Sequence, residues 1–165
     1  RYASPATPPM PPSVRIEITP STALSPTPHA AIATLCTLPY DEPFAEYLAP
    51  LPSPTHVLAW EGDTLASHAC WVARDLVVGG VPLRSAYVEA VATDPARQGR
   101  GHATRVLRAL AAAIAEPDAG FALGVLSPSD EAFYARLGWA PWRGPLAVAG
   151  DAGLEPTPDE RVMYL

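Results

Sequence analysis

Proline is the feature of this sequence that most restricts its fold. Thirteen of the 21 prolines precede residue 55, and five of them fall within residues 1–12. Because proline fixes φ and lacks a backbone N–H, neither a long helix nor a central strand can run through such a segment. We therefore predict an irregular arm over residues 1–12, short helical pieces and turns over residues 38–54, and a single domain over residues 13–165.

The rest of the chain shows periodic patterns of apolar residues. Alternation and short apolar runs predict strands over residues 14–18, 57–60, 64–78, 85–93, 121–126, 144–149 and 161–165. Apolar residues at helical spacing predict helices over residues 28–37, 101–115 and 127–138. In the last of these, Ser127 and Asp130 resemble a capping box with Pro128 in the first turn. Gly138 suits the end of that helix.

Composition and charge exclude several classes of protein. All 11 basic residues are Arg, so Schiff-base chemistry, pyridoxal phosphate and a Walker-type phosphate site have no lysine to use. The net charge of −6 argues against a nucleic-acid binder and favours small cationic partners. No apolar stretch reaches the roughly 18 residues of a membrane span, so we expect no membrane association. The first residues form neither the basic region nor the apolar core of a signal peptide, so we expect a cytoplasmic protein.

Cysteine and histidine are too few and too scattered to predict a disulfide framework or a metal site. Cys36 and Cys70 are the only cysteines, and nothing in their sequence surroundings marks either as a nucleophile. The four histidines show no ligand spacing, so we expect no metal ion.

The most informative segment runs from Gln98 to Ala103, directly after a predicted strand and directly before a predicted helix. Gly99 and Gly101 allow a tight turn and a close approach of the backbone to a ligand. The free N–H groups and the positive dipole end of the helix point into this turn, which makes it a candidate site for a pyrophosphate. Residues 95–115 carry four arginines and no acid, which supports this interpretation.

The pattern Gln98-x-x-Gly101-x-Ala103 resembles the acyl-CoA signature of the GNAT acetyltransferase superfamily, Q/R-x-x-G-x-G/A. In that fold the signature lies between the fourth strand and the third helix. Residues 87–92 and 127–145 are similar to the aminoglycoside 2′-N-acetyltransferases within the superfamily. The resemblance implies an α/β (α+β) fold: a central mixed, mostly antiparallel sheet of roughly six to seven strands, splayed at the fourth strand and flanked by about four helices.

The same resemblance implies a coenzyme and its binding residues. Acetyl-CoA is the expected co-substrate, with its pantetheine along Val91, Ala92 and Thr93 of the splayed strand. Its pyrophosphate is expected on the turn and the helix start, where the binding residues would be Gln98, Gly99, Arg100, Gly101, His102, Ala103 and Thr104. The other partner is an amine acceptor, and a homodimer is compatible with the resemblance.

Acetylation of an amine by a thioester needs a base, donors for the oxyanion and an acid for the leaving thiolate. Strand alternation would place Glu89 on the same face as Val91 and Thr93. Glu89 is the candidate base, and the alternative is a carboxylate paired with an arginine at the sheet edge. The resemblance implies that Tyr134 is the general acid at the thioester sulfur, and the alternative is a core residue. A backbone amide near Val91 would donate to the oxyanion.

Acidic and hydroxyl side chains are the candidates for binding a cationic acceptor. The resemblance places acceptor contacts in the Pro-rich region, at Asp41, Glu42 and Glu46, and at the start of the last helix, at Ser127 and Ser129. Glu89, the candidate base, would also contact the acceptor. Asp151, Asp159 and Glu160 would complete an acidic rim, although solvated surface acids are an equally good interpretation. The aminoglycoside enzymes continue past the final strand into a tail that helps to bind the drug, whereas this sequence stops at Leu165. We therefore expect either a differently built pocket or another amine.

Three functions remain open at this point. The first is an acetyl-CoA-dependent N-acetyltransferase of the aminoglycoside 2′ type, acting by direct attack in a ternary complex. The second is a GNAT enzyme for another small amine or for a protein amino group. The third is a non-catalytic acyl-CoA-binding domain, which would keep the turn from Gln98 to Ala103 but would not need Glu89 or Tyr134.

Overall fold

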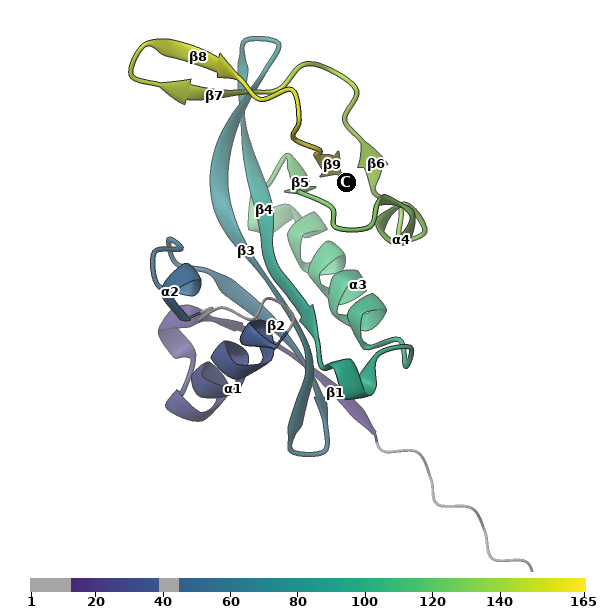
Figure 1. Cartoon of the computed structure of the whole chain (residues 1–165). Coiled ribbons are helices and arrows are strands. Elements are labelled where there is room, and N and C mark those ends of the chain that lie inside the picture. Colours follow the sequence, from purple (N-terminus) through teal and green to yellow (C-terminus); the bar gives the residue numbers. More distant parts are fainter. Residues whose placement is uncertain (1–12, 39–44) are drawn as a thin grey trace, which may run out of the picture.

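A twisted seven-stranded sheet forms the centre of the protein in the computed structural model, which describes residues 13–38 and 45–165 (Figure 1). The predicted arm over residues 1–12 and the acidic pair Asp41 and Glu42 lie outside the described residues. The strands of this sheet are β1 (Val14–Pro20), β2 (Thr55–Glu61), β3 (Thr64–Val78), β4 (Val81–Thr93), β5 (Leu123–Leu126), β6 (Ala140–Pro141) and β9 (Met163–Tyr164). Their order is β1-β2-β3-β4-β5-β9-β6; β4 and β5 are parallel, and the other neighbours are antiparallel. This confirms the predicted mixed, mostly antiparallel sheet.

Helices cover both faces of the sheet (Figure 1). On one face lie α1 (Pro26–Thr37) and α2 (Ala45–Leu48), and on the other lie α3 (His102–Ala115) and α4 (Glu131–Ala135). Short 3₁₀ turns occur at Ser21–Ala23, Pro95–Arg97 and Pro117–Ala119. Four α-helices within the described ranges agree with the predicted number. None of the helices in these ranges is long and apolar enough to cross a membrane.

The pleat of the strands creates two separate cores. Val57 and Leu58 are neighbours in β2, point to opposite faces and are both fully buried. The α3 core comprises Val57, Ala59, Ala69, Trp71, Ala86, Val88, Val106, Leu107, Leu110, Ile114, Leu126, Tyr134, Trp139 and Met163. The α1 core comprises Ile32, Leu35, Cys36, Leu58, Trp60, Leu65, Cys70, Ala90 and Ala92. Burial on both faces explains why the inner strands consist of nearly continuous apolar runs.

The sheet opens between β4 and β5. These strands pair only where Ser85–Tyr87 meet Leu123–Val125. From Val88 onward, β4 pairs only with β3 among the described residues. One edge of β4 therefore faces a gap in the sheet, which confirms the predicted splay at the fourth strand.

The last predicted helix starts later than its sequence suggests. α4 begins at Glu131, and the Asp130 carboxylate accepts a hydrogen bond from the backbone N–H of Phe133 at 3.1 Å. Asp130 is therefore the N-cap, whereas Ser127 and Pro128 belong to the segment that joins β5 to the helix. Proline restricts the residue before it to extended conformations, which keeps Ser127 out of the helix. Gly138 ends the following turn with φ of 95°.

The two closing strands are only partly as predicted. β7 (Ala147–Gly150) pairs with β8 (Gly153–Pro156) in a separate two-stranded sheet that projects from the end of the molecule (Figure 1). All residues of this hairpin are exposed, so no buried face ties it to the main sheet. β6, which the sequence did not indicate, joins β9 instead. A two-residue strand is too short to show a periodic pattern.

Candidate functional site

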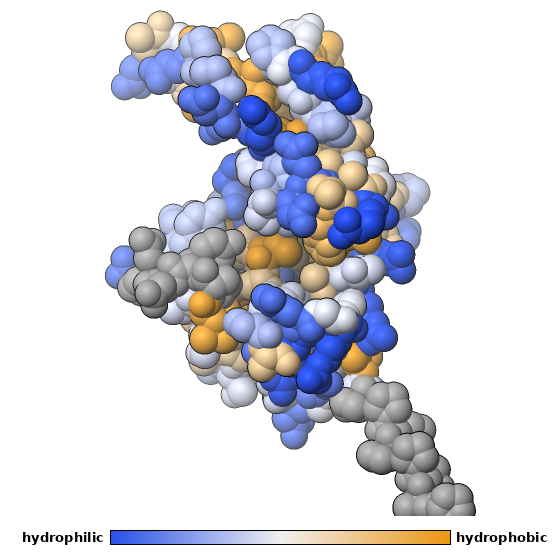
Figure 2. Space-filling view, turned by 45° about the vertical axis from the view of Figure 1, so that its right-hand side comes forward, coloured by the Kyte–Doolittle hydropathy of each residue, from blue (hydrophilic) through white to orange (hydrophobic). Residues whose placement is uncertain are grey.

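A groove of about 750 Å³ lies between the end of β4, the start of α3 and the start of α4. It is lined by Val91, Ala92, Thr93, Arg97, Gln98, Gly99, Gly101, His102, Ala103, Thr104, Ser129, Asp130 and Phe133. All residues predicted to bind the coenzyme therefore line it, except Arg100. Ser129, predicted as an acceptor contact, lines the same groove. The space-filling view shows a hollow at mid-height with hydrophobic residues on its floor and hydrophilic residues around it (Figure 2).

Backbone groups dominate the end of the groove formed by α3. Gly101 is the N-cap in the left-handed conformation, with φ of 78° and no side-chain cap. The first helical hydrogen bond runs from the N–H of Arg105 to the carbonyl oxygen of Gly101, so the N–H groups of residues 102–104 precede it. A Cβ added at Gly99 or Gly101 would meet no atom within 4 Å. Both glycines thus border open space, as expected of a backbone cradle for an anion.

The basic side chains of the turn are less free than the sequence suggested. Arg97 Nε lies 2.9 Å from Glu61 Oε2, and Arg97 also pairs with Asp94. The hydrogen bond to Asp94 is the main factor that raises the pKa of Arg97. Arg100 Nη1 lies 3.2 Å from Glu61 Oε1, and Arg100 does not line the groove. Glu61 belongs to the β2–β3 hairpin, 36 residues before Arg97, so no local pattern could have revealed this contact.

His102 occupies the variable position of the signature and is buried in the groove wall. Neither of its ring nitrogens has a hydrogen-bond partner among the described residues. Its Nε2 lies 3.7 Å from Glu61 Oε2. His102 therefore adds a buried polar group to the wall that the sequence-based interpretation treated as a backbone position.

A β-bulge interrupts the alternation of β4. His68 pairs with Ala92 and Cys70 pairs with Glu89, so β4 contains one more residue than β3 between these two pairs. Ala90 lies in this interval and has φ of 55°, a left-handed conformation that is rare for residues other than glycine. The extra residue reverses the face to which all later side chains of β4 point.

The bulge corrects the predicted position of Glu89. Cys70, directly opposite Glu89, belongs to the α1 core, whereas Val91 packs against the α3 core and lines the groove with Thr93. Glu89 therefore faces α1, and the prediction that it shares a face with Val91 and Thr93 is wrong. Periodicity alone could not reveal the change, because the bulge depends on a backbone conformation that an alanine adopts only in its tertiary context.

Glu89 is held by two side chains. Tyr47 in α2 donates its hydroxyl to Glu89 Oε2 at 2.5 Å, and Arg74 Nη2 lies 3.1 Å from Glu89 Oε1. Burial of the phenol, together with its hydrogen bond to Glu89 and the charge of that group, raises the pKa of Tyr47. The alternative interpretation of Glu89 as the partner of an arginine thus describes its contacts, and the side chain of Glu89 is 13% exposed. Sequence analysis missed Tyr47 and Arg74.

The remaining predicted residues separate into three environments. The hydroxyl oxygens of Ser127 and Tyr87 lie 3.2 Å apart, within hydrogen-bond distance. Tyr134 is buried in the α3 core, with its ring edge-on to Phe133 and Trp139, and it is not among the groove-lining residues. The predicted acids that the structure describes are exposed and line no part of the groove; they are Glu46, Asp151, Asp159 and Glu160.

Both cysteines are buried thiols. Burial raises the pKa of Cys36 to about 12 and also raises the pKa of Cys70, so neither forms a thiolate nucleophile readily. The potential ligand atoms of His56, His68 and Cys70 lie within 4.8 Å of one another, a cluster that spacing in the sequence did not reveal. The ring nitrogens that face each other in this cluster are joined by a hydrogen bond of 2.9 Å between the two histidines.

Comparison with known families agrees with this fold. The family described as "Acetyltransferase (GNAT) domain" matches residues 32–142. The chain therefore belongs to the GNAT acetyltransferase family. It is 37% identical over 107 residues to the aminoglycoside 2′-N-acetyltransferase of Mycolicibacterium fortuitum, a match that covers 64% of this chain and 53% of that protein. The chain thus spans about half the length of the curated relative that it matches.

Solved structures share the fold at low sequence identity. Eis1 from Mycobacterium abscessus is 21% identical with a TM-score of 0.64, over 83% of this chain and 38% of that chain. An acyl-CoA N-acyltransferase from Pseudomonas aeruginosa is 18% identical with a TM-score of 0.63, over 92% of this chain and 99% of that chain. At these identities the likeness shows the fold alone.

Proposed function

We propose that the protein is an acetyl-CoA-dependent N-acetyltransferase, which transfers an acetyl group to an amine of a small cationic acceptor by direct attack in a ternary complex. The 2′-amino group of an aminoglycoside is the first acceptor to test, because the relative from Mycolicibacterium fortuitum carries that activity in its name. The observation that carries the proposal is the open edge of β4, with the groove on its α3 side and Glu89 on its α1 side. The two reactants would approach from opposite faces and meet at the gap.

The groove suits the phosphates of a coenzyme A thioester. Glycines at positions 99 and 101 leave the space beside the backbone open, and the N–H groups of residues 102–104 supply donors. Arg97 adds a cation to the wall, and Thr104 adds a hydroxyl. Bound there, acetyl-CoA supplies the reactive acetyl thioester, while Val91, Ala92 and Thr93 line its path toward the gap.

Glu89 serves as the base in this proposal. Its carboxylate attracts the ammonium group of the acceptor and takes the proton, directly or through a water, so that the nitrogen lone pair can attack. Tyr47 and Arg74 fix the carboxylate by contacting different oxygens. As the C–N bond forms and the C–S bond breaks, a backbone N–H near Val91 stabilises the oxyanion and Tyr134 protonates the departing thiolate.

A related enzyme for another small amine or a protein amino group is the second candidate. It is favoured by the placement of the acids predicted to form a rim. Asp151, Asp159 and Glu160 lie in or after the projecting β7–β8 hairpin, away from α2, whose Tyr47 contacts Glu89 (Figure 1). The acidic net charge of −6 still favours a cationic acceptor in general. The choice between the acceptors therefore depends on a direct assay.

The experiment measures release of free coenzyme A thiol from acetyl-CoA with a panel of aminoglycosides and polyamines. Glu89→Gln keeps the shape of the side chain and should lower turnover by about 10- to 10³-fold near neutral pH, with partial recovery at high pH where the acceptor is already deprotonated. Acetyl-CoA affinity should be unchanged. Asp75→Asn, which removes an exposed acid from β3, is the matched control and should keep full turnover.

Two results would contradict the proposed role of Glu89. One is wild-type turnover of Glu89→Gln at every pH, and the other is a defect confined to coenzyme binding. If the wild-type protein binds acetyl-CoA but acetylates no member of the panel, the non-catalytic acyl-CoA-binding domain becomes the better description.

A further inference from the structure

Two buried histidines lie behind the bulge of β4 and take no part in the proposed chemistry. His68 on β3 is fully buried, and His56 on β2 is 4% exposed. His56 Nδ1 lies 2.9 Å from His68 Nε2, and His68 Nδ1 lies 2.8 Å from the carbonyl oxygen of Ala90. A continuous chain of hydrogen bonds therefore joins β2, β3 and the bulge.

The carbonyl at one end fixes the direction of every bond in this chain. The oxygen of Ala90 only accepts, so His68 must carry its proton on Nδ1 and donate it. The Nε2 atom of His68 is then a bare acceptor and receives the Nδ1–H of His56. Both rings are thus neutral in the Nδ1–H tautomer, in agreement with burial, which lowers the pKa of His56 to about 4 and that of His68 to about 3.

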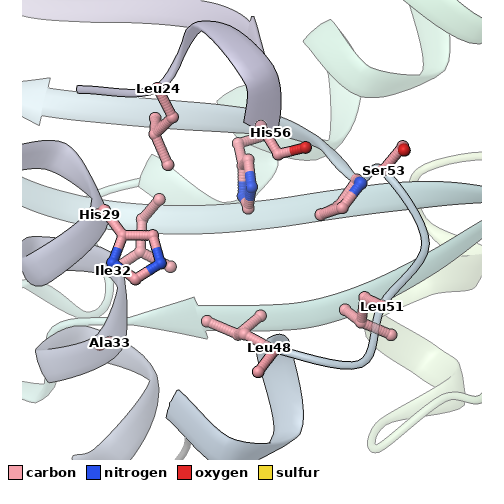
Figure 3. A pocket seen from close by; sticks show the side chains of 11 residues that line it. Leu24, His29, Ile32, Ala33, Leu48, Leu51, Ser53 and His56 are labelled. Carbon is pink, nitrogen blue, oxygen red and sulfur yellow. The ribbon is translucent and has the colours of Figure 1, made fainter. Parts of the chain in front are cut away.

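The outer end of the chain reaches a second cavity. His56 lines a space of about 330 Å³ between α1, α2 and the start of β2. Figure 3 shows its imidazole, with that of His29, among the side chains of Leu24, Ile32, Leu48 and Leu51. The largely apolar wall offers few alternative partners, so the most direct partner for His56 Nδ1 is His68. The orientation of His68 is therefore set from outside as well as from the bulge.

The inner end of this chain of hydrogen bonds is Ala90, which has the most unusual backbone conformation in β4. Ala90 has φ of 55°, where the Cβ of an L-residue is crowded, and such a conformation persists only when its surroundings enforce it. The hydrogen bond from His68 is anchored on this residue, and Cys36 Sγ lies 3.9 Å from the same carbonyl oxygen. Without the bulge, regular alternation would return Glu89 and Val91 to one face of β4.

We propose that His68 is a positioning residue for acetyl transfer: through its hydrogen bond to the Ala90 carbonyl it holds the β4 bulge that directs Glu89 to the α1 face and Val91 to the groove. His56 helps to fix the orientation of the His68 ring through the hydrogen bond to its Nε2 atom. The inference rests on the proposed function, because it assigns Glu89 and the groove to one reaction. It adds a residue that contacts neither reactant and acts only through the backbone of β4.

The test compares two substitutions of His68. His68→Leu fills the site but cannot donate to Ala90, so turnover should fall at least tenfold and coenzyme A affinity should fall at least threefold. In His68→Asn, the side-chain amide nitrogen is separated from Cα by the same number of bonds as Nδ1 of histidine, so it can donate to the Ala90 carbonyl instead. Turnover and coenzyme A affinity should therefore stay within threefold of wild type. Ile32→Val, a cavity-forming change in the α1 core, is the stability control and should leave turnover unchanged.

A spectroscopic measurement supplies a readout that folding stability does not affect. Long-range ¹H–¹⁵N correlation spectra of the wild-type protein should show both His56 and His68 as Nδ1–H tautomers. An Nε2–H tautomer at His68, full function in His68→Leu, or equal defects in His68→Asn and His68→Leu would each overturn the proposal. If His68→Leu does not fold, the tautomers and His68→Asn still decide. If the wild-type protein acetylates no amine, the proposed function fails separately, and coenzyme A affinity becomes the quantity compared among the variants.

Discussion

The hydrogen-bonded pair of His56 and His68 should make this protein sensitive to mild acid. Burial lowers the pKa of His56 to about 4 and is also the main cause that lowers the pKa of His68 to about 3, whereas an unperturbed histidine titrates near 6.5. Below pH 6.5 both histidines therefore bind a proton in the unfolded chain but stay neutral in the folded protein. The free energy of unfolding is consequently at its full value above pH 6.5 and falls as the pH decreases toward 4.

The size of the effect follows from the two pKa values. Between pH 7.5 and 5 each histidine stays neutral in the folded protein but becomes charged in the unfolded chain, which lowers the free energy of unfolding by about 2 kcal/mol per residue. The pair should account for about 4 kcal/mol, against a total of about 5–15 kcal/mol for a typical domain. Carboxylates contribute little in this range, because their unperturbed pKa values lie near 4. The pKa of Asp94 is lowered, chiefly because its carboxylate accepts a hydrogen bond from the backbone N–H of Ala96. Its contribution to the free energy of unfolding is therefore lost only at more acidic pH.

Urea unfolding followed by tryptophan fluorescence measures this free energy at pH 7.5, 6.5, 5.5 and 5.0 and constant ionic strength. The midpoint should fall steadily with pH while the slope with urea stays constant. His68→Asn should reduce the pH dependence by about half, and Ile114→Val, which changes no titratable group and lies in the α3 core, should leave it unchanged. A change below about 1 kcal/mol between pH 7.5 and 5 would refute the assignment of two buried neutral histidines.

Two further predictions concern the proposed reaction. Gly101→Val should place a side chain in the open space beside the cradle and weaken coenzyme A binding at least tenfold, about 1.4 kcal/mol, as measured by calorimetry. Gly62→Val imposes a similar left-handed strain at the β2–β3 hairpin and should leave the affinity for coenzyme A unchanged; equal affinities in both variants would reject the cradle. Tyr134→Phe keeps the ring in the α3 core and should lower turnover by roughly 10²-fold with little change in coenzyme binding, whereas wild-type turnover in a steady-state assay would assign Tyr134 to packing alone.

Local patterns predicted the parts of the protein that depend on local physics. The strand from Thr64 to Val78 has the predicted bounds, and α3 begins one residue after the predicted start. Their apolar periodicities are long enough to distinguish a strand from a helix. The turn at Gly101 was recognisable because its left-handed backbone requires glycine, so the sequence itself records the conformation. The family resemblance supplied the mostly antiparallel pairing of the sheet and the splay at the fourth strand, which periodicity cannot provide.

Side-chain partners far apart in the chain were not predictable. Glu61 holds Arg97 and Arg100 across the end of β4, and Tyr47 reaches Glu89 from α2. Each of these residues is an ordinary surface type that carries no mark of its partner in the sequence. Their separation along the chain means that only the packing of the hairpin and the helices brings them together.

The sequence by itself determined where the elements lie and where a phosphate-binding turn can form, because glycine, proline and apolar spacing act within a few residues. Tertiary structure alone decided which face of β4 carries Glu89. Ala90 has no intrinsic preference for φ of 55°, and its carbonyl is bound by His68, 22 residues away in the chain. A long-range hydrogen bond to one backbone oxygen is associated with the reversal of all later side chains of the strand, because strand residues alternate with a period of two.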